Sequence, residues 1–462
     1  MKPRYSQDTI AAIATPPGQG AIGVVRLSGG KTSGMLGKIF VPTGRSKPME
    51  SHRFYHGQVV NGKDRHPIDE AMAVFFQAPR SYTREDMAEI YTHGGSLVVK
   101  KTLTAIIAAG ARLAEPGEFT RRAFLNGRID LAQAEAVLQL IQATNEQALK
   151  WATAQLAGQL SSHLGHIRSE LVQVLAQIEA GIDFPEEELD LISLEQAEKM
   201  LSQQIKGLKR ILDSYDQARA HREGLLTVIV GKPNVGKSSL FNALLQENRV
   251  ITSPQPGTTR DFIEELMYLE GVALRLNDTA GLGEKETGPL SREAGQRARG
   301  RLEQADLVLL VLDISQPLGP EDEGIARLIG SQRGIVVLNK SDLNQVVSKE
   351  EVEIIAPGLP GISVSAKTGA GIAGLQKLII DQGVTKGVES EPLVITSLRH
   401  KQALARTCQA LNRGRLSLKK GSAMEFVAVD VKEALSYLGE ITGEVTSEEV
   451  LDLIFSQFCL GK

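Results

Sequence analysis

The chain of 462 residues carries 52 Lys and Arg against 55 Asp and Glu, a formal net charge of −3. This near-balance excludes a strongly basic nucleic-acid coat protein, and an apolar content of 42% excludes global disorder. At about 150 residues per domain, the length predicts about three domains. The two cysteines, Cys408 and Cys459, are too few for a disulfide framework, and the polar N-terminus lacks the apolar core of a signal peptide. We therefore expect a soluble cytoplasmic protein without membrane spans.

Residues 1–125 alternate short β-like runs with turns. The runs at 21–27 and 71–77 are predicted strands, because they are apolar and bounded by Gly, Pro and Asn. Residues 97–111 are a predicted helix. We therefore expect an α+β domain over residues 1–125.

Residues 126–220 form a long region rich in Ala, Gln and Leu. Asp130 with Gln133, and Ser193 with Gln196, have the spacing of a capping box and predict two helix starts. Two apolar stripes recur at spacings of three and four, as in helices that bury one face in a bundle. The first stripe is Leu160, Leu164, Ile167, Leu171, Val174 and Ile178, and the second is Leu201, Ile205, Leu208, Leu212 and Tyr215.

Residues 221–385 alternate apolar β runs with helical stretches, the βαβ pattern of a parallel sheet. Residues 386–462 return to a helical pattern. The simplest topology inserts the α/β domain into an all-α domain, whose two parts are residues 126–220 and 386–462. The predicted fold class is therefore multidomain, with an α+β N-terminal domain, a helical domain and an inserted α/β domain.

The segment GKPNVGKS, Gly231 to Ser238, fits the phosphate-binding pattern G-x-x-x-x-G-K-[ST]. It follows an apolar strand and precedes a helix, so its backbone N–H groups can surround phosphate oxygens. Lys237 can reach the β- and γ-phosphates, and the Ser238 hydroxyl can ligate Mg²⁺. The expected phosphate contacts are Asn234, Val235, Gly236, Lys237, Ser238 and Ser239.

Two later segments fit the γ-phosphate side of the same site. DTAG, Asp278 to Gly281, follows a β-like run, so Asp278 can hold the water shell of Mg²⁺ and the Gly281 N–H can meet the γ-phosphate. GTTRD, Gly257 to Asp261, supplies a Thr that can complete the Mg²⁺ shell, which makes this loop a switch. The expected nucleotide contacts are Thr258, Thr259, Asp278, Thr279, Ala280 and Gly281.

A base-binding pair of motifs follows. NKSD, Asn339 to Asp342, ends a β run, and a carboxylate there can accept both N1–H and N2–H₂ of guanine, a donor pair that adenine lacks. The Lys340 stem can cover the base, and a backbone N–H of Ser365, Ala366 or Lys367 can meet guanine O6. Together the motifs favour GTP over ATP. The set resembles the translation-factor-like class of small P-loop GTPases.

The residue after the DTAG glycine is Leu282, where many GTPases have a water-orienting Gln. An apolar side chain cannot position water, so hydrolysis is slow or another group supplies the catalysis. Asn234 offers a side-chain oxygen close to the phosphates. This resembles the potassium-dependent GTPases, in which K⁺ takes the place of an arginine finger; a turn role for Asn234 stays open.

The flanking segments carry a more specific resemblance. The N-terminal block contains TPPGQGAIGVVRLSG (residues 15–29), SYTREDMAEIYTHGG (81–95) and PGEFTRRAFLNGRIDLAQAEAV (116–137), and the chain ends in FCLGK (458–462). With the inserted GTPase domain, the whole chain resembles the MnmE (TrmE) family of tRNA modification GTPases.

This resemblance implies an N-terminal domain that binds folate and forms a homodimer. It implies joint action with an FAD-dependent partner, MnmG, in a heterotetramer that modifies C5 of the wobble uridine of certain tRNAs. The implied cofactors are GTP, Mg²⁺, K⁺ and 5-formyl- or methylene-tetrahydrofolate, which supplies the one-carbon unit. Potassium-dependent approach of two G domains would stimulate hydrolysis and drive a conformational cycle.

The resemblance also implies residue roles in this chain. The implied catalytic residues are Lys237, Thr259, Asp278 and Cys459. The implied folate contacts are Arg26, Glu89, Arg128 and Lys462. The implied K⁺ contacts are Asn234, Ser253, Gln255 and Thr258, with Ser253 also at GTP, and the implied Mg²⁺ ligands are Ser238 and Thr259. Arg128 stands where the family often has Lys.

Two positions leave alternatives open. Cys459 lies on an apolar run with a helical pattern, where a lone Cys is usually a buried hydrophobe, whereas the terminal C-x-G-K pattern favours a chemical role near folate. The Glu that orients water in the family aligns with Ser291, and Glu284, Glu286 or Glu293 are candidate substitutes.

Residues 396–420 contain seven Lys and Arg and no acid, which fits either a tRNA-phosphate face or a solvated helix face. Charge reversal at Arg413 and Arg415 tests the first reading, because it should lower the affinity for tRNA only if these residues contact phosphates. Two functional alternatives remain: a ribosome-assembly GTPase that binds rRNA, and a non-enzymatic nucleotide-binding adaptor.

Overall fold

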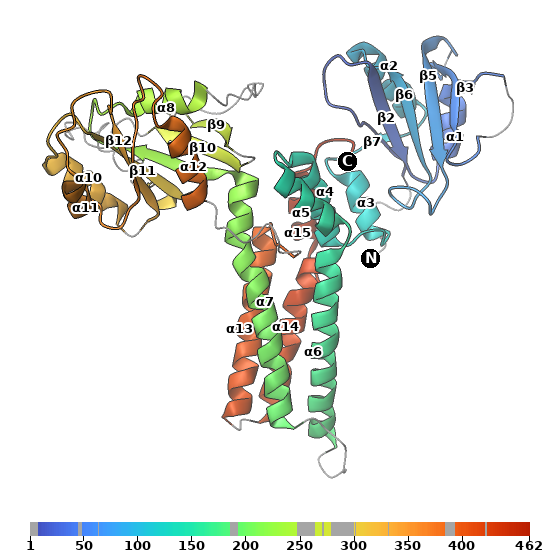
Figure 1. The fold of residues 1–462 in the computed structure, drawn as a ribbon. Coiled ribbons are helices and arrows are strands. Elements are labelled where there is room, and N and C mark those ends of the chain that lie inside the picture. The colour runs from blue at the N-terminus through green and yellow to red at the C-terminus, as the bar shows by residue number, and fades with distance from the viewer. Residues whose placement is uncertain are drawn as a thin grey trace, which may run out of the picture. The chain divides into compact units, whose positions relative to one another are not determined.

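The computed structural model describes most of the chain in two compact units. Unit 1 comprises Met1–Ile141, Gln155–Glu198 and Gln409–Lys462, and unit 2 comprises Gln142–Ala154 and Lys199–Cys408. Figure 1 draws both. The described residues are 8–44, 49–62, 64–184, 193–246, 264–269, 272–278, 300, 302–330, 332–383, 393–420 and 423–462.

A seven-stranded sheet with the order β3-β4-β5-β6-β2-β1-β7 forms the N-terminal part of unit 1. Its neighbours are antiparallel except for β1 and β7. Helices α1 (Thr32–Ile39) and α2 (Ser96–Ala108) pack on one face, which confirms the predicted α+β character. The strands are β1 (Ile10–Ile13), β2 (Ile22–Ser28), β3 (Phe40–Pro42), β4 (Phe54–Val60), β5 (Pro67–Phe76), β6 (Met87–His93) and β7 (Arg112–Leu113).

Helix α3 (Glu118–Leu125) ends the segment predicted as the N-terminal domain, and α4 (Leu131–Gln142) is the first helix of the predicted helical region. The Asp130–Gln133 capping box is confirmed, because each backbone N–H donates to the other residue's side chain. The C-terminal helix α15 (Glu448–Ser456) packs against α3 and α4 through a shared apolar cluster. The C-terminus therefore lies beside α3 (Figure 1).

Long helices follow, and their apolar stripes are buried as predicted. Helix α6 (Gln159–Asp183) buries all six residues of the first stripe and runs along α14 (Met424–Thr442) (Figure 1). Helix α7 (Leu194–Glu223) begins at the predicted Ser193–Gln196 box. Four of the five residues in its stripe are buried, and Leu212 is half-buried. Helices α5 (Glu146–Leu156) and α13 (Leu398–Lys419) also lie in the predicted helical regions.

The basic window on α13 is partly neutralised within unit 1. Arg413 forms ion pairs with Asp430 and Glu433 of α14, and Arg415 lies 3.7 Å from Glu198. Arg413 and Arg415, which would contact phosphates on a tRNA-binding face, therefore lie next to carboxylates of this chain.

Unit 2 holds a six-stranded sheet with the order β13-β12-β11-β8-β10-β9, parallel except for β9. Apolar clusters cover both faces, as expected for strands that are buried on both sides. The strands are β8 (Leu225–Val230), β9 (Glu264–Leu269), β10 (Val272–Asp278), β11 (Leu307–Asp313), β12 (Gly334–Asn339) and β13 (Gly361–Ser363). The helices are α8 (Lys237–Gln246), α10 (Pro320–Ile329), α11 (Lys349–Ile355) and α12 (Ile372–Gly383).

These elements come between α7 and α13 in the chain, so the α/β domain is inserted between helical segments (Figure 1). The predicted fold class is confirmed. Among the described helices, none combines the length and the apolar character that a bilayer crossing requires.

Candidate functional site

The segment predicted to bind phosphate joins the end of β8 to the start of α8. A Cβ at Gly231 would lie 2.5 Å from the Val311 carbonyl oxygen, and Gly236 has φ +95°, so both positions require glycine. Lys237 Nζ donates to the carbonyl oxygens of Gly231 and Lys232, at 2.8 and 3.0 Å. Its ammonium group is therefore held inside the loop.

Ser238 and Ser239 lie in the first turn of α8 and are exposed. The backbone N–H groups at such a helix start have no intrahelical acceptor, which suits them to phosphate oxygens. Asn234 is exposed with φ +64°, so its side chain is open to solvent at the tip of the loop. This conformation suits a turn residue and also leaves the amide oxygen available to a cation.

Asn339, at the end of β12, links the phosphate loop to the predicted base-binding loop. Its Nδ2 donates to the Val235 carbonyl at 2.8 Å, and its Oδ1 accepts from the Ala366 N–H at 3.0 Å. The side chain is buried. The GKPNVGKS, NKSD and SAK motifs therefore converge at the carboxyl ends of the parallel strands β8, β12 and β13.

Asp342 accepts a hydrogen bond from Ser365 Oγ at 2.6 Å. This bond lowers the pKa of Asp342, so the exposed carboxylate stays ionised and able to accept from a base. Lys340 has φ +66°, and its Nζ lies 2.6 Å from Asp313 Oδ2 at the end of β11. Sequence reasoning missed Asp313, although a carboxylate at the end of a buried strand was a visible signal.

Asp278 is the last residue of β10 and pairs in register with Ile229, two residues before the phosphate loop. Its backbone therefore lies next to the strand end from which that loop starts. The remaining expected residues on the γ-phosphate side fall outside the described residues: Ser253, Gln255, Thr258, Thr259, Thr279, Ala280, Gly281, Leu282, Glu284, Glu286, Ser291 and Glu293.

A second cluster occupies the sheet face of unit 1 opposite α1 and α2. Arg26 of β2 and Glu89 of β6 are in register, and Arg26 Nη2 lies 2.7 Å from Glu89 Oε1. Tyr91 donates its hydroxyl to Glu89 Oε2 at 2.6 Å. Burial and the Glu89 carboxylate raise the pKa of Tyr91 to about 12. Arg26 Nε also donates to Glu89 Oε1 at 2.8 Å, so it is Oε2 that keeps a second lone pair for a ligand.

The C-terminal tail contacts this cluster through its last two residues. Arg26 Nη1 donates to the Gly461 carbonyl at 3.1 Å, and the Lys462 carbonyl accepts from the Phe119 N–H. Burial, with the nearby Arg26 guanidinium, lowers the pKa of Lys462. Arg26, Glu89 and Lys462, which are far apart in the sequence, thus share one site.

Cys459 is exposed and lies beyond the end of α15, so its predicted helical placement was wrong. The helix ends at Ser456, and Gly461 in the tail that follows lies close to the Ile13 carbonyl of β1. Cys408 is buried, as predicted, and burial raises the pKa of its thiol to about 11.

The ring of Tyr82 connects the fourth implied folate contact to this cluster. The Arg128 guanidinium carbon lies 4.7 Å from the ring centroid, and that of Arg26 lies 5.6 Å from the same centroid. Phe119 also lies beneath Arg26, at 5.7 Å. Sequence reasoning missed these aromatic rings, which lie within two of the quoted N-terminal motifs.

Comparisons with known proteins cover both units. The MnmE helical domain model matches residues 131–459, and the model of the GTP-binding protein TrmE N-terminus matches residues 9–128. The tRNA modification GTPase MnmE of Heliobacterium modesticaldum is 45% identical over 464 residues, 98% of this chain and 99% of that protein. That of Geotalea uraniireducens is 42% identical over 460 residues, 99% of this chain and all of that protein. The chain therefore belongs to the MnmE family of tRNA modification GTPases.

Proposed function

We propose that this chain is the GTP-hydrolysing component of a complex that adds an aminomethyl or carboxymethylaminomethyl group to C5 of the tRNA wobble uridine. The observation that supports the GTPase activity is the pair of hydrogen bonds through which Asn339 joins the phosphate loop to the base-side loop. The tRNA substrate is proposed because relatives that match 98–99% of the chain are tRNA modification GTPases.

The described residues fit a guanine nucleotide with Mg²⁺. Lys237 and the N–H groups at the start of α8 bind phosphate oxygens, while Asp342 accepts from the guanine edge. Ser238 and Thr259 are the proposed Mg²⁺ ligands; the metal would neutralise charge that develops on the phosphates. Asp278 would hold its water shell.

Potassium is the proposed activator. Leu282 cannot orient water, so charge stabilisation must come from elsewhere. The open side chain of Asn234 supports a cation site, which Ser253, Gln255 and Thr258 would complete. Two G domains would approach each other to close it.

Folate is the proposed cofactor of unit 1, as 5-formyl- or methylene-tetrahydrofolate. Glu89 would read the amide-like edge of the pterin, and Arg26, Arg128 and Lys462 would pair with the carboxylates of the tail. The exposed thiol of Cys459 near this cluster supports its candidacy as a reactive residue. The homodimer and the FAD-dependent partner MnmG are proposed from the family resemblance.

The deciding experiment is GTP hydrolysis by the full chain in KCl and in NaCl at equal ionic strength, over a range of protein concentrations. We expect faster turnover in KCl and a rate per molecule that rises with concentration. Asn234→Ala should abolish the difference between the salts. Equal, slow rates in both salts would overturn the potassium mechanism, and no turnover in either would favour a nucleotide-binding adaptor.

A further inference from the structure

A row of three arginines extends from the proposed folate site across Tyr82. Arg26 and Arg128 both lie over the Tyr82 ring, at 5.6 and 4.7 Å from its centroid. Arg84 reaches the turn that precedes Arg128: its Nη1 donates to the Asn126 carbonyl at 3.0 Å and would be 3.5 Å from a Cβ on Gly127. The three guanidinium groups therefore lie between the Tyr82 ring and the turn after α3.

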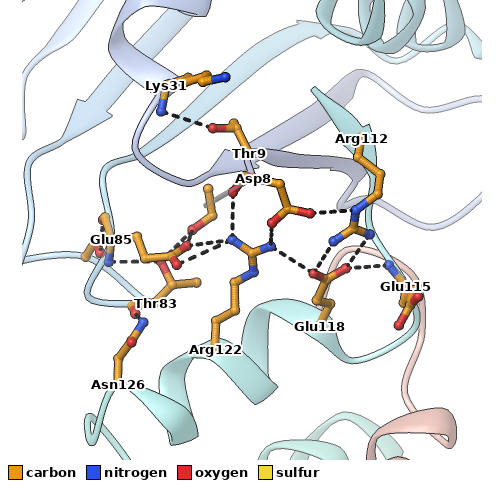
Figure 2. A network of polar contacts seen from close by, with 12 residues as sticks. Asp8, Thr9, Lys31, Thr83, Glu85, Arg112, Glu115, Glu118, Arg122 and Asn126 are labelled. Carbon is orange, nitrogen blue, oxygen red and sulfur yellow. Dashed lines mark hydrogen bonds and ion pairs between the residues drawn. The ribbon is translucent and has the colours of Figure 1, made fainter. Parts of the chain in front are cut away.

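The carboxylates close to this row have other partners. Glu85 accepts a hydrogen bond from Ser28. It also pairs with Arg122 (Figure 2). Asp86 accepts from the Ala78 N–H, and Asp130 caps α4. Within the part of the chain that the structure describes, neither Arg84 nor Arg128 pairs with a carboxylate, and both are exposed. The row thus presents uncompensated positive charge beside the site.

Most of the donors of Arg84 are not used by the contact with Asn126. The backbone of Arg84 has a φ of +58°, in the left-handed region. The hydrogen bond to Asn126 uses one of five guanidinium N–H groups and leaves the others for a ligand. A guanidinium binds a carboxylate through two parallel hydrogen bonds.

We propose that Arg84, together with Arg128, binds the γ-linked glutamates of a polyglutamylated tetrahydrofolate; this rests on the proposed folate site. With the pterin at Glu89 and the first glutamate at Arg128, each further glutamate adds one carboxylate, for which the exposed Arg84 guanidinium is the proposed partner. The preferred ligand is therefore a folate that carries several glutamates. A tRNA phosphate is the competing ligand, and the test separates the two.

The test measures the affinity of the full chain for 5-formyltetrahydrofolate with one glutamate and with three, by titration calorimetry at low salt. We expect the triglutamate form to bind about 5- to 10-fold more tightly, in line with two partly exposed ion pairs. The ratio should shrink as salt rises. Arg84→Gln should remove most of the ratio while it leaves monoglutamate affinity within about twofold.

Arg65→Gln is the matched control, because Arg65 is also an exposed arginine of this sheet domain at positive φ, in the β4–β5 turn. It should leave the ratio unchanged. Equal affinities for the two forms, or an unchanged ratio in Arg84→Gln, would overturn this inference alone. Failure of both forms to bind would overturn the folate proposal and this inference with it. Lost tRNA affinity in Arg84→Gln at an unchanged ratio would assign Arg84 to nucleic-acid phosphates instead.

Discussion

Asn339 is a single buried side chain whose two polar atoms hold two loops together. Asn339→Ala would leave the Val235 carbonyl and the Ala366 N–H without this partner. Each unsatisfied buried group costs about 1–3 kcal/mol. We expect the Kd for GDP with Mg²⁺ to rise at least about tenfold, measured with a fluorescent nucleotide. The exposed Asn344, five residues later, supplies the control Asn344→Ala, and an unchanged Kd in folded Asn339→Ala would contradict this role.

A substitution of Glu89 tests the proposed folate site, again at the scale of a single residue. Glu89→Gln keeps the size of the side chain but replaces one acceptor oxygen by a donor, so it can no longer accept both N–H groups of a pterin edge. Hydrogen bonds to a charged group contribute about 1.5–3 kcal/mol, so the Kd for 5-formyltetrahydrofolate should rise about 10- to 100-fold. Glu70→Gln, on an exposed carboxylate of β5, should have no effect. Equal affinities of Glu89→Gln and the native chain would show that folate does not bind here.

At the scale of elements, one polar network fastens α3 to the N-terminal strands. Arg122 of α3 pairs with Asp8, Glu85 and Glu118, and Arg112 of β7 pairs with Asp8 and Glu118 (Figure 2). Removal of one partner from a buried ion pair costs about 3–5 kcal/mol because the other charge stays buried. Arg122→Met should therefore lower the free energy of unfolding of unit 1 by that amount in urea titrations. Arg53→Met, on an exposed pair, should change it little.

The same network makes unit 1 sensitive to acid. Burial opposes ionisation of Asp8 and Glu118, but hydrogen bonds from Arg112 and Arg122 outweigh it, so both pKa values lie below their usual range. Each contribution is complete above the unfolded pKa, about 4, and is lost as the pH falls through the lower folded pKa. The free energy of unfolding should therefore fall from pH 5 toward pH 3. Glu118→Gln should flatten this dependence, and an equally steep profile in that variant would contradict the assignment.

Local patterns explain which elements could be predicted from the sequence. The Asp130–Gln133 and Ser193–Gln196 boxes each join residues three positions apart, and the phosphate loop lies between a strand and a helix that adjoin it in the chain. The partners of Arg26 and Arg413 could not be found in this way. Arg26 meets the carbonyl of Gly461, 435 residues away, and the acids facing Arg413 lie on another helix. Such contacts depend on how distant segments pack.

At the scale of the whole molecule, each of the two units has its own apolar core and its own proposed ligand. Unit 2 carries the phosphate and base loops, and unit 1 carries the Arg26–Glu89 cluster. A ligand that binds only the folded state stabilises it by RT ln(1 + [L]/Kd), about 2.7 kcal/mol at 100 times Kd. For a unit of roughly 200 residues, this raises the Tm by about 5–10 °C.

We therefore expect scanning calorimetry of the full chain to resolve two transitions with separate ligand responses. GDP with Mg²⁺ should raise the Tm of one transition, and 5-formyltetrahydrofolate should raise the other, because each proposed site consists of residues of a single unit. Asn339→Ala should weaken the GDP shift alone, and Glu89→Gln the folate shift alone. A single transition that both ligands raise would mean that the two units unfold together, in which case occupancy of one site would stabilise the fold around the other.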